Sequence, residues 1–334
     1  MTKLFTKKNV TLFIVSLICS GPVFADQPAT GPFSYISSAS SSARNQDVSS
    51  PEVSCDKSGV WVSGDLLYWT VCEGGFACDY GSTAITKTFN GTKTVTVIDE
   101  ESGDLDFEWD FGFRLGAGYK GSSCWDAAAY WTHFRSDGDS HNGANQADWK
   151  LKFDEADAVF GYKLQYCKVN HIKRVTLTPS LGVRYAQINQ NFSSHVETSL
   201  PGATLGSTTQ AITTKSNSER FWGVGPLLGF ETDFCFGKGF GAYGNLAGTV
   251  LYGNFKIASD ESTVFTAIIN DCATSANNCA VIPGFNAGVG LSYEISFVQL
   301  KCGWDHHTYF DYNKIGSNGN LNLYGVNGSV TFIF

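Results

Sequence analysis

Apolar and polar residues alternate strictly along residues 104–119, whose sequence is DLDFEWDFGFRLGAGY. Every second residue is apolar, and the residues between them are charged or glycine. Because successive side chains of a β-strand point to opposite faces, the pattern predicts a strand with one apolar and one polar face. A soluble strand is usually about five or six residues long, so this strand is long enough to cross a membrane.

The same alternation predicts nine further strands. They are expected at residues 60–71, 125–135, 149–166, 175–187, 222–234, 240–255, 285–295, 298–304 and 320–334. Within residues 149–166 the apolar side chains change face near residues 154–155, as a β-bulge would cause. A hairpin that includes residues 92–98 would raise the number of strands from ten to twelve.

The connections alternate between short and long. Short turns are expected at residues 120–123, 167–173, 236–239 and near 296, and longer polar loops at 72–103, 136–148, 189–219, 258–282 and 305–319. Short turns at one rim and long loops at the other are typical of outer-membrane β-barrels. Since an open sheet edge cannot be satisfied in hydrocarbon, we expect an all-β, transmembrane, antiparallel up-and-down barrel of about ten strands (10–12), with short periplasmic turns and long outer loops.

A secreted β-sandwich is the alternative fold, because its strands would also alternate. Its strands would be shorter, and their outward positions would carry Lys, Glu and Thr instead of repeated glycine. The glycines within the predicted strands lie mostly on the polar faces, where they permit curvature and close approach. The pattern therefore favours the barrel.

Both ends of the chain resemble targeting signals. Three lysines precede an apolar core at residues 10–19, and Val23 and Ala25 occupy the small-residue cleavage positions, which predicts a Sec signal peptide at residues 1–25. Residues 26–58 are serine-rich and are expected to form a flexible periplasmic leader, followed by the barrel at 59–334. The last strand carries alternating aromatic residues that we expect the barrel-assembly machinery to read: Tyr324, Phe332 and Phe334.

Composition excludes some partners and anchors. The net charge of −8 argues against nucleic acid as a partner. No segment after the signal approaches eighteen consecutive apolar residues, so no helical anchor is expected. The expected location is the bacterial outer membrane, in contact with outer-membrane lipid and lipopolysaccharide.

Several stretches resemble one family in their order along the chain. These are VWVSGDLLYW, FEWDFGFRLGAGY, YWTHF, WKLKFDEADAVFGYKL, LTPSLGVRYAQINQNF and LYGVNGSVTFIF. They resemble the legionella-type pore-forming major outer-membrane proteins, which include porin-like proteins of chlamydia-like bacteria. The resemblance implies a porin that admits small solutes or ions by passive diffusion and contributes to envelope structure. The alternative is a non-conducting surface barrel, either an adhesin or a disulfide-linked structural coat protein.

Charged residues on the predicted inner face are the candidate site. By parity they are Asp106, Glu108, Asp110, Arg114, Lys150, Lys152, Asp154, Arg184 and Glu231. Such residues line a wet lumen or pair with one another across strands. Ten strands enclose a narrow interior that side chains can fill, so an open pore and a plugged barrel both remain possible at this point.

The mature chain keeps nine of the ten cysteines, in a compartment that permits disulfides. Two pairs lie inside predicted loops and are candidate local disulfides: Cys72 with Cys78, and Cys272 with Cys279. Four cysteines are expected at the periplasmic rim and are candidates for cross-links to a second copy or to other envelope proteins: Cys55, Cys124, Cys167 and Cys235. An odd total leaves at least one thiol unpaired or bonded to another chain; reduced cysteines that act as small apolar residues are the alternative, which suits Cys302 best.

An enzyme is a further alternative, because an Asp–His pair can act as a general base. The candidates are Asp305, His306 and His307, together with Asp137, Asp139, His133 and His141. No nucleophile or metal-ligand spacing accompanies them, and the G-x-S-x-G, P-loop and H-E-x-x-H motifs are absent. We therefore expect neither enzymatic activity nor a cofactor or metal.

Overall fold

The computed structural model describes residues 58–73, 86–89, 92–95, 106–142, 145–169, 172–201, 208–265, 268–313 and 319–334. The predicted signal peptide, and the predicted leader except for its last residue, lie outside these ranges. The strands are β1 (Gly59–Glu73), β2 (Thr86–Phe89), β3 (Thr92–Val95), β4 (Asp106–Phe107), β5 (Asp110–Lys120), β6 (Trp125–Asn142), β7 (Asn145–Tyr162), β8 (Leu164–Val169), β9 (Ile172–Pro201), β10 (Thr208–Gly237), β11 (Phe240–Phe265), β12 (Ile268–Ile295), β13 (Val298–Asn313) and β14 (Gly319–Ile333). Within these ranges, no helix has both the length and the apolar character needed to cross a membrane.

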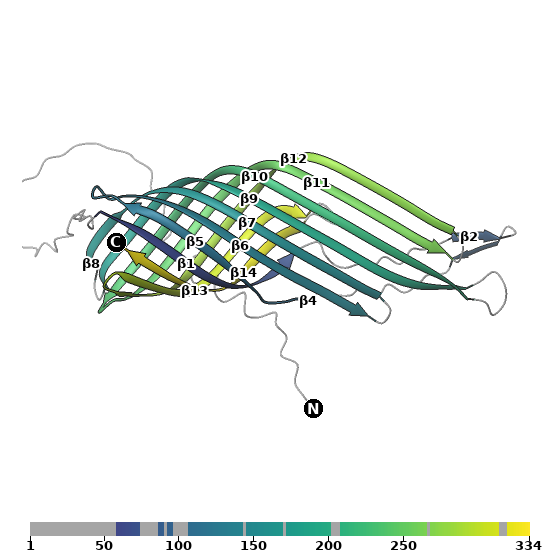
Figure 1. Ribbon diagram of the computed structural model, residues 1–334, viewed down its shortest axis with the longest axis horizontal. Helices are drawn as coiled ribbons and strands as arrows, with labels where there is room; N and C mark the ends of the chain where they lie inside the picture. Colours follow the sequence, from purple (N-terminus) through teal and green to yellow (C-terminus); the bar gives the residue numbers. More distant parts are fainter. Residues whose placement is uncertain are drawn as a thin grey trace, which may run out of the picture. The chain divides into compact units, whose positions relative to one another are not determined.

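Ten of the strands close into an antiparallel barrel (Figure 1). The order around the barrel is β1, β5, β6, β7, β9, β10, β11, β12, β13 and β14, and β14 pairs with β1 to complete the ring. β4 adds a short pairing to β6, β8 adds one to β9, and β2 and β3 form a separate two-stranded sheet. The prediction of a closed barrel of about ten strands is confirmed.

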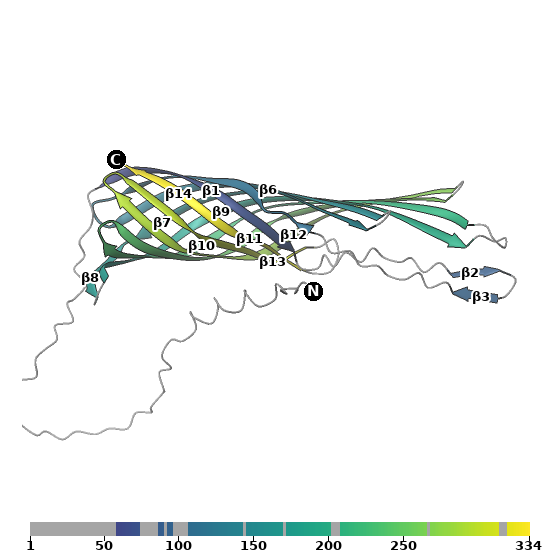
Figure 2. The same cartoon turned by 90° about the horizontal axis from the view of Figure 1, so that it is seen from below.

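Several strands continue far beyond their predicted ends. β9 and β10 have 30 residues each, β11 has 26 and β12 has 28, and Figure 2 shows these four strands running on past their neighbours. Most of the predicted loops 136–148, 189–219 and 258–282 are therefore strand, which corrects that part of the prediction. Their polar residues are typical of loops, yet each segment pairs with its neighbour outside the apolar band, where the outer face can meet water.

The outer face carries a broad band of exposed apolar side chains, as a lipid-facing surface requires. Leu66 is 60 % exposed, Phe111 is 68 % exposed and Leu291 is 68 % exposed. Aromatic rings gather toward the end of the band, where Tyr68 lies 5.3 Å from Trp109 between ring centroids. Tryptophan and tyrosine at such a boundary are typical of the membrane–water interface.

The polarity of the two faces inverts along β7. Trp149 and Phe153 are fully buried inside the barrel, whereas Lys150 and Lys152 lie on the outer face. The pairing of β7 with β6 and β9 runs through this region without a register shift, so the predicted bulge near residues 154–155 is wrong. The alternation of inward and outward side chains continues along the whole strand, and only the surroundings change. Beyond the lipid band the outer face meets water and the inner face packs into a dry core.

The predicted strand 104–119 is interrupted in the structure. Glu108 and Trp109 fall between β4 and β5. Phe107 packs inward, with its ring centroid 4.9 Å from that of Trp149, whereas Trp109 is 40 % exposed on the outside. The strict alternation puts Phe107 on the same apolar face as Trp109, which predicts that both face lipid; for Phe107 this is wrong, because the break moves it into the core at the outer end.

Close packing of β10 against β11 depends on Gly253. A Cβ atom at this position would overlap the backbone of Trp222 and Gly223. The substitution Gly253→Ala is expected to lower the free energy of unfolding by about 1–3 kcal/mol. A matched control is Gly248→Ala, because nothing lies within 4 Å of a Cβ there, and its effect is expected to stay within about 0.5 kcal/mol. Urea unfolding of both variants in lipid vesicles measures the difference, and equal stabilities would contradict this packing.

Candidate functional site in the barrel interior

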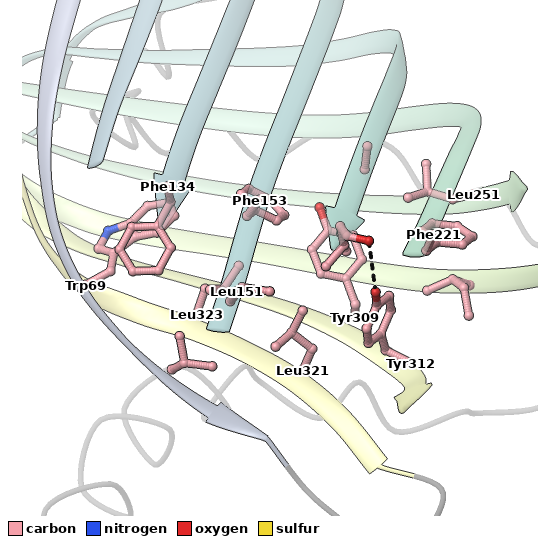
Figure 3. Close-up of a cluster of buried hydrophobic side chains, with 14 of the residues drawn as sticks. Trp69, Phe134, Leu151, Phe153, Phe221, Leu251, Tyr309, Tyr312, Leu321 and Leu323 are labelled. Atoms are coloured by element: carbon pink, nitrogen blue, oxygen red, sulfur yellow. Dashed lines mark hydrogen bonds between the residues drawn. The ribbon is translucent and has the colours of Figure 1, made fainter. Parts of the chain in front are cut away.

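A cluster of buried apolar side chains fills the interior where the barrel leaves the lipid band (Figure 3). We call this set the outer cluster. Its members are Leu67, Trp69, Val71, Phe134, Trp149, Leu151, Phe153, Ala186, Ile188, Phe221, Leu251, Phe255, Ile282, Tyr309, Tyr312, Leu321 and Leu323. None is more than 3 % exposed, so the interior at this level is packed like the core of a soluble protein.

Two tyrosines from the outer end of β13 reach across the interior. The hydroxyl of Tyr309 donates a hydrogen bond to Glu155 on β7, and that of Tyr312 donates one of 3.3 Å to the backbone oxygen of Ile188 on β9. Residues three apart on a regular strand would point to opposite faces. Here Asp311 has a φ of 55° and the β13–β14 register shifts between Tyr309 and Asn313, which turns both tyrosines inward.

Arg184 on β9 holds two acidic side chains of β7 beside the outer cluster. Its guanidinium lies 2.7 Å from Asp157 and 3.2 Å from Glu155, and it donates a 3.0 Å hydrogen bond to Asn286 on β12. The Arg184 and Glu155 side chains are each 3 % exposed. The planar guanidinium donates two parallel hydrogen bonds to the Asp157 carboxylate. Arg184 thereby links β7, β9 and β12 across the interior.

Arg114 on β5 forms a second network closer to β1 and β13. Its guanidinium lies 3.6 Å from Asp65 and 3.4 Å from Asp305, and its Nε donates a 3.1 Å hydrogen bond to Thr132. Asn327 donates a further 3.0 Å hydrogen bond to Asp305. Charges buried to this extent are stable only when they are paired, and here each carboxylate has a cation within reach.

The interior on the other side of these networks is polar and reached by water. Glu231 is exposed to solvent although it lies on the inner face of β10, and its charge interacts with those of Lys301 and Lys163. Lys163 also pairs with Asp126 at 2.9 Å, with both side chains 19 % exposed. The lumen therefore has two parts: a charged, wet part toward the short turns and a dry closure at the outer end.

Four of the predicted lumen residues lie on the inner face: Asp110, Arg114, Arg184 and Glu231. Two residues of the predicted set have a different status. Glu108 is exposed at the break before β5, and the side chain of Asp106 lies outside the described part of the chain.

Lys150, Lys152 and Asp154 lie on the outer face, so their prediction as lumen residues is wrong. Directly paired residues share a face of the sheet, and Asp154 pairs with His133, 2.6 Å away on the outside of β6. The error follows from the supposed bulge, because the parity was inverted for this half of the strand.

Sequence reasoning missed Glu155 and Tyr309 as lumen residues. Residues 156, 158 and 160 were correctly assigned to the outer face, and continuing their alternation back without a bulge would have placed Glu155 inside. Tyr309 lay in a predicted loop, and nothing in the local pattern indicates that it crosses the interior.

The three candidate acid–base residues on β13 are divided between the two faces of the strand. Asp305 and His307 are buried inside, where His307 Nε2 lies 3.4 Å from Arg114. His306 points outward and its Nε2 lies 2.8 Å from Thr308 Oγ1. Asp305 is already engaged by Arg114 and Asn327, so the three residues do not form an Asp–His pair in this structure.

The predicted loop disulfide between Cys272 and Cys279 is wrong. Both residues are exposed, free thiols within β12, and seven residues of extended strand span roughly 24 Å. A disulfide requires the two Cα atoms within about 7 Å. Cys72 is also free and exposed, and its predicted partner Cys78 lies outside the described residues.

The cysteines predicted at the periplasmic rim differ in their state. Cys235 is a free, half-buried thiol, whereas Cys124 is 3 % exposed and disulfide-bonded. Cys124 is therefore not available for a cross-link to another chain in this structure. Cys55 and the side chain of Cys167 lie outside the described part.

Comparison with known proteins places this barrel in a family. The model of the family described as Legionella pneumophila major outer membrane protein precursor matches residues 52–330. A search of curated proteins gives no match.

Solved outer-membrane proteins are similar at a low level. Neisserial surface protein A (NspA) is 12 % identical over 84 % of this chain and 100 % of its own, with a TM-score of 0.29. Ail of Yersinia pestis, solved with the heparin analogue sucrose octasulfate, is 10 % identical over 83 % of this chain and 100 % of its own, with a TM-score of 0.26. A mutant of the TodX monoaromatic hydrocarbon channel is 8 % identical over 83 % and 90 %, with a TM-score of 0.28. Likeness at this level says nothing about function. With the family match over residues 52–330 and the closed barrel, the chain belongs to the Legionella major outer membrane protein family and is an outer-membrane β-barrel.

Proposed function

We propose that the protein is a porin-like channel for small solutes or ions whose lumen is closed at its outer end in the conformation described here. One observation carries the proposal: a wet, charged interior ends at a closure that includes two tyrosines from the irregular end of β13. Because Tyr309 and Tyr312 reach the far wall from one strand end, movement of that end would remove a central part of the closure.

The charged lining supports a path for polar solutes. Buried ion pairs are poor sources of stability, because desolvation offsets much of their attraction and apolar replacements are often as stable. Ionisable residues inside membrane-spanning segments usually mark a pathway or a binding site. A barrel with a purely structural role could fill its interior with apolar residues throughout. Here Glu231, Asp126 and Lys163 keep part of the interior hydrated.

A second candidate is a permanently closed surface barrel, an adhesin or coat protein. It is favoured by the complete burial of the outer cluster and by the length of β9 to β12 beyond the lipid band. In that case the elongated strands would be the working surface and the interior network would only hold the barrel together.

Single-channel recording in planar bilayers tests the proposal. Purified protein is expected to give stepwise openings separated by long closed periods, since the closure must be displaced before ions can pass. Detergent without protein is the control. Silence at all voltages, with the protein folded and inserted, would contradict the channel and favour the surface barrel.

Export and assembly are part of the same proposal. We infer that residues 1–25 direct Sec export and that the aromatic last strand directs assembly. The last strand is suited to this role, because Phe334 is 75 % exposed and its backbone nitrogen donates a 2.8 Å hydrogen bond to Val60 at the closing seam.

A further inference from the structure

Four cations lie in one row around the outside of the barrel. Arg135 on β6 is directly opposite Lys152 on β7, and Arg220 on β10 is directly opposite Lys256 on β11. Asn189 on β9 joins the two pairs, because it is paired with both Lys152 and Arg220. We call these five residues the cation row. It crosses four inter-strand spacings, or roughly 19 Å.

Like charges that are directly opposite on a sheet repel each other. Lys152 is partly neutralised, because Asp154 lies 3.3 Å away. The pair of Arg220 and Lys256 differs, since none of its cross-strand or same-face neighbours on β9 to β12 is acidic. Those neighbours are Gln187, Asn189, Asn191, Ser218, Trp222, Asn254, Ala258, Ser275, Asn277 and Cys279. No ion pair to Arg220 or Lys256 occurs within the described ranges, and both side chains are exposed.

The height of the cation row along the barrel indicates what neutralises it. Two positions toward the short turns, Trp222 is 49 % exposed on the same face as Arg220. Four positions away, Trp131, Tyr185 and Tyr252 belong to one row with exposures of 45 %, 39 % and 61 %. Aromatic rings of this kind lie at the level of lipid headgroups, and each step of two residues is about 7 Å. The cation row therefore lies on the water side of these rings, within reach of the headgroups of the outer leaflet.

We propose that the cation row binds the phosphate groups of a lipid in the outer leaflet. Arginine and lysine are the side chains that bind phosphate, arginine with two parallel hydrogen bonds. One uncharged residue, Asn189 on β9, separates the two cation pairs, so a headgroup with two phosphates can engage both. A soluble polyanion fits less well, because the aromatic rings on the membrane side of the cation row place it beside the lipid interface.

Lipid binding measured by native mass spectrometry tests this site on the full protein purified from membranes. The probes are lipid A with two phosphates, dephosphorylated lipid A with the same acyl chains, and inorganic phosphate. Wild-type protein is expected to retain the phosphorylated lipid at least tenfold better than the dephosphorylated one. The double variant Arg220→Gln/Lys256→Gln is expected to lose this preference.

A matched control is Lys215→Gln/Lys238→Gln, which removes two exposed cations outside the cation row. It should keep the preference of the wild type. If the first double variant does not fold, as judged by its heat-modifiable gel mobility, Arg135→Gln/Lys152→Gln tests the other half of the row. The proposal is overturned if the row variants bind like wild type, if the control loses the preference equally, or if inorganic phosphate alone displaces the lipid at comparable concentration.

Discussion

Replacing Arg184 with methionine is expected to lower the free energy of unfolding by about 3–5 kcal/mol, the usual result of breaking a buried ion pair from one side. The substitution leaves Glu155 and Asp157 close together in the interior without a cation, and it removes the hydrogen bond to Asn286. Guanidinium unfolding in lipid vesicles, followed by tryptophan fluorescence, measures the loss.

Two further variants separate the charge effect from loss of packing. Adding Glu155→Gln and Asp157→Asn to Arg184→Met should restore most of the stability, because the orphaned carboxylates are then neutral. Lys215→Met breaks an exposed pair with Glu261, 3.7 Å apart and nearly half exposed on both sides, and should cost less than about 1 kcal/mol. An Arg184→Met protein that is as stable as Lys215→Met would show that the network contributes little.

The second large effect is expected from the double variant Tyr309→Ala/Tyr312→Ala in the channel recordings. It removes two fully buried rings and both hydroxyl contacts across the lumen. If these contacts stabilise the closed state by about 1.4–2.8 kcal/mol, their loss raises the ratio of open to closed time about 10- to 100-fold. The lumen should also become wider at its outer end.

Tyr252→Ala is the matched control, because this tyrosine is 61 % exposed on the outer face. It should leave the open time unchanged. Tyr309→Phe keeps the ring and loses only the hydroxyl, so its effect should lie between those of wild type and the double variant. A double variant that is folded and inserted yet remains closed would place the closure elsewhere in the outer cluster.

Much of the barrel is predictable because alternation is a local signal. β1 and β14 lie close to their predicted ranges, and the exposed Leu66 and buried Leu67 follow from period two alone. Closure follows from the same pattern, since a strand with a lipid-facing side needs a partner on each edge. These features depend on neighbouring residues and on the solvent, both of which can be read from a single sequence.

The inner face of β7 could not be read in this way. Alternation reveals two faces but does not say which one is inside, and that assignment used the rule that lipid-facing residues are apolar. The rule holds for Phe160 and reverses for Phe153, because the strand leaves the membrane between them. Lys150, Lys152 and Asp154 were therefore assigned to the wrong side.

Contacts across the lumen could not be predicted from the sequence for a different reason. Tyr309 and Glu155 are 154 residues apart in sequence, and they meet only because ten strands close with one particular stagger. The turn of Tyr312 into the interior also needs the backbone irregularity at Asp311. Neither the stagger nor the irregularity leaves a local pattern in the sequence.

The inversion of polarity along β7 also fixes how deeply the barrel is inserted in the bilayer. Sinking by two residues, about 7 Å, would carry Lys152 and its row toward hydrocarbon, where the cost of each cation rises from about 0–1 kcal/mol near the interface toward the midplane value. Rising by the same step would lift Trp131 and Tyr185 into water. Because both displacements are unfavourable, a bilayer of different thickness must deform around the protein. The barrel therefore imposes the thickness of its own apolar band on the surrounding lipid.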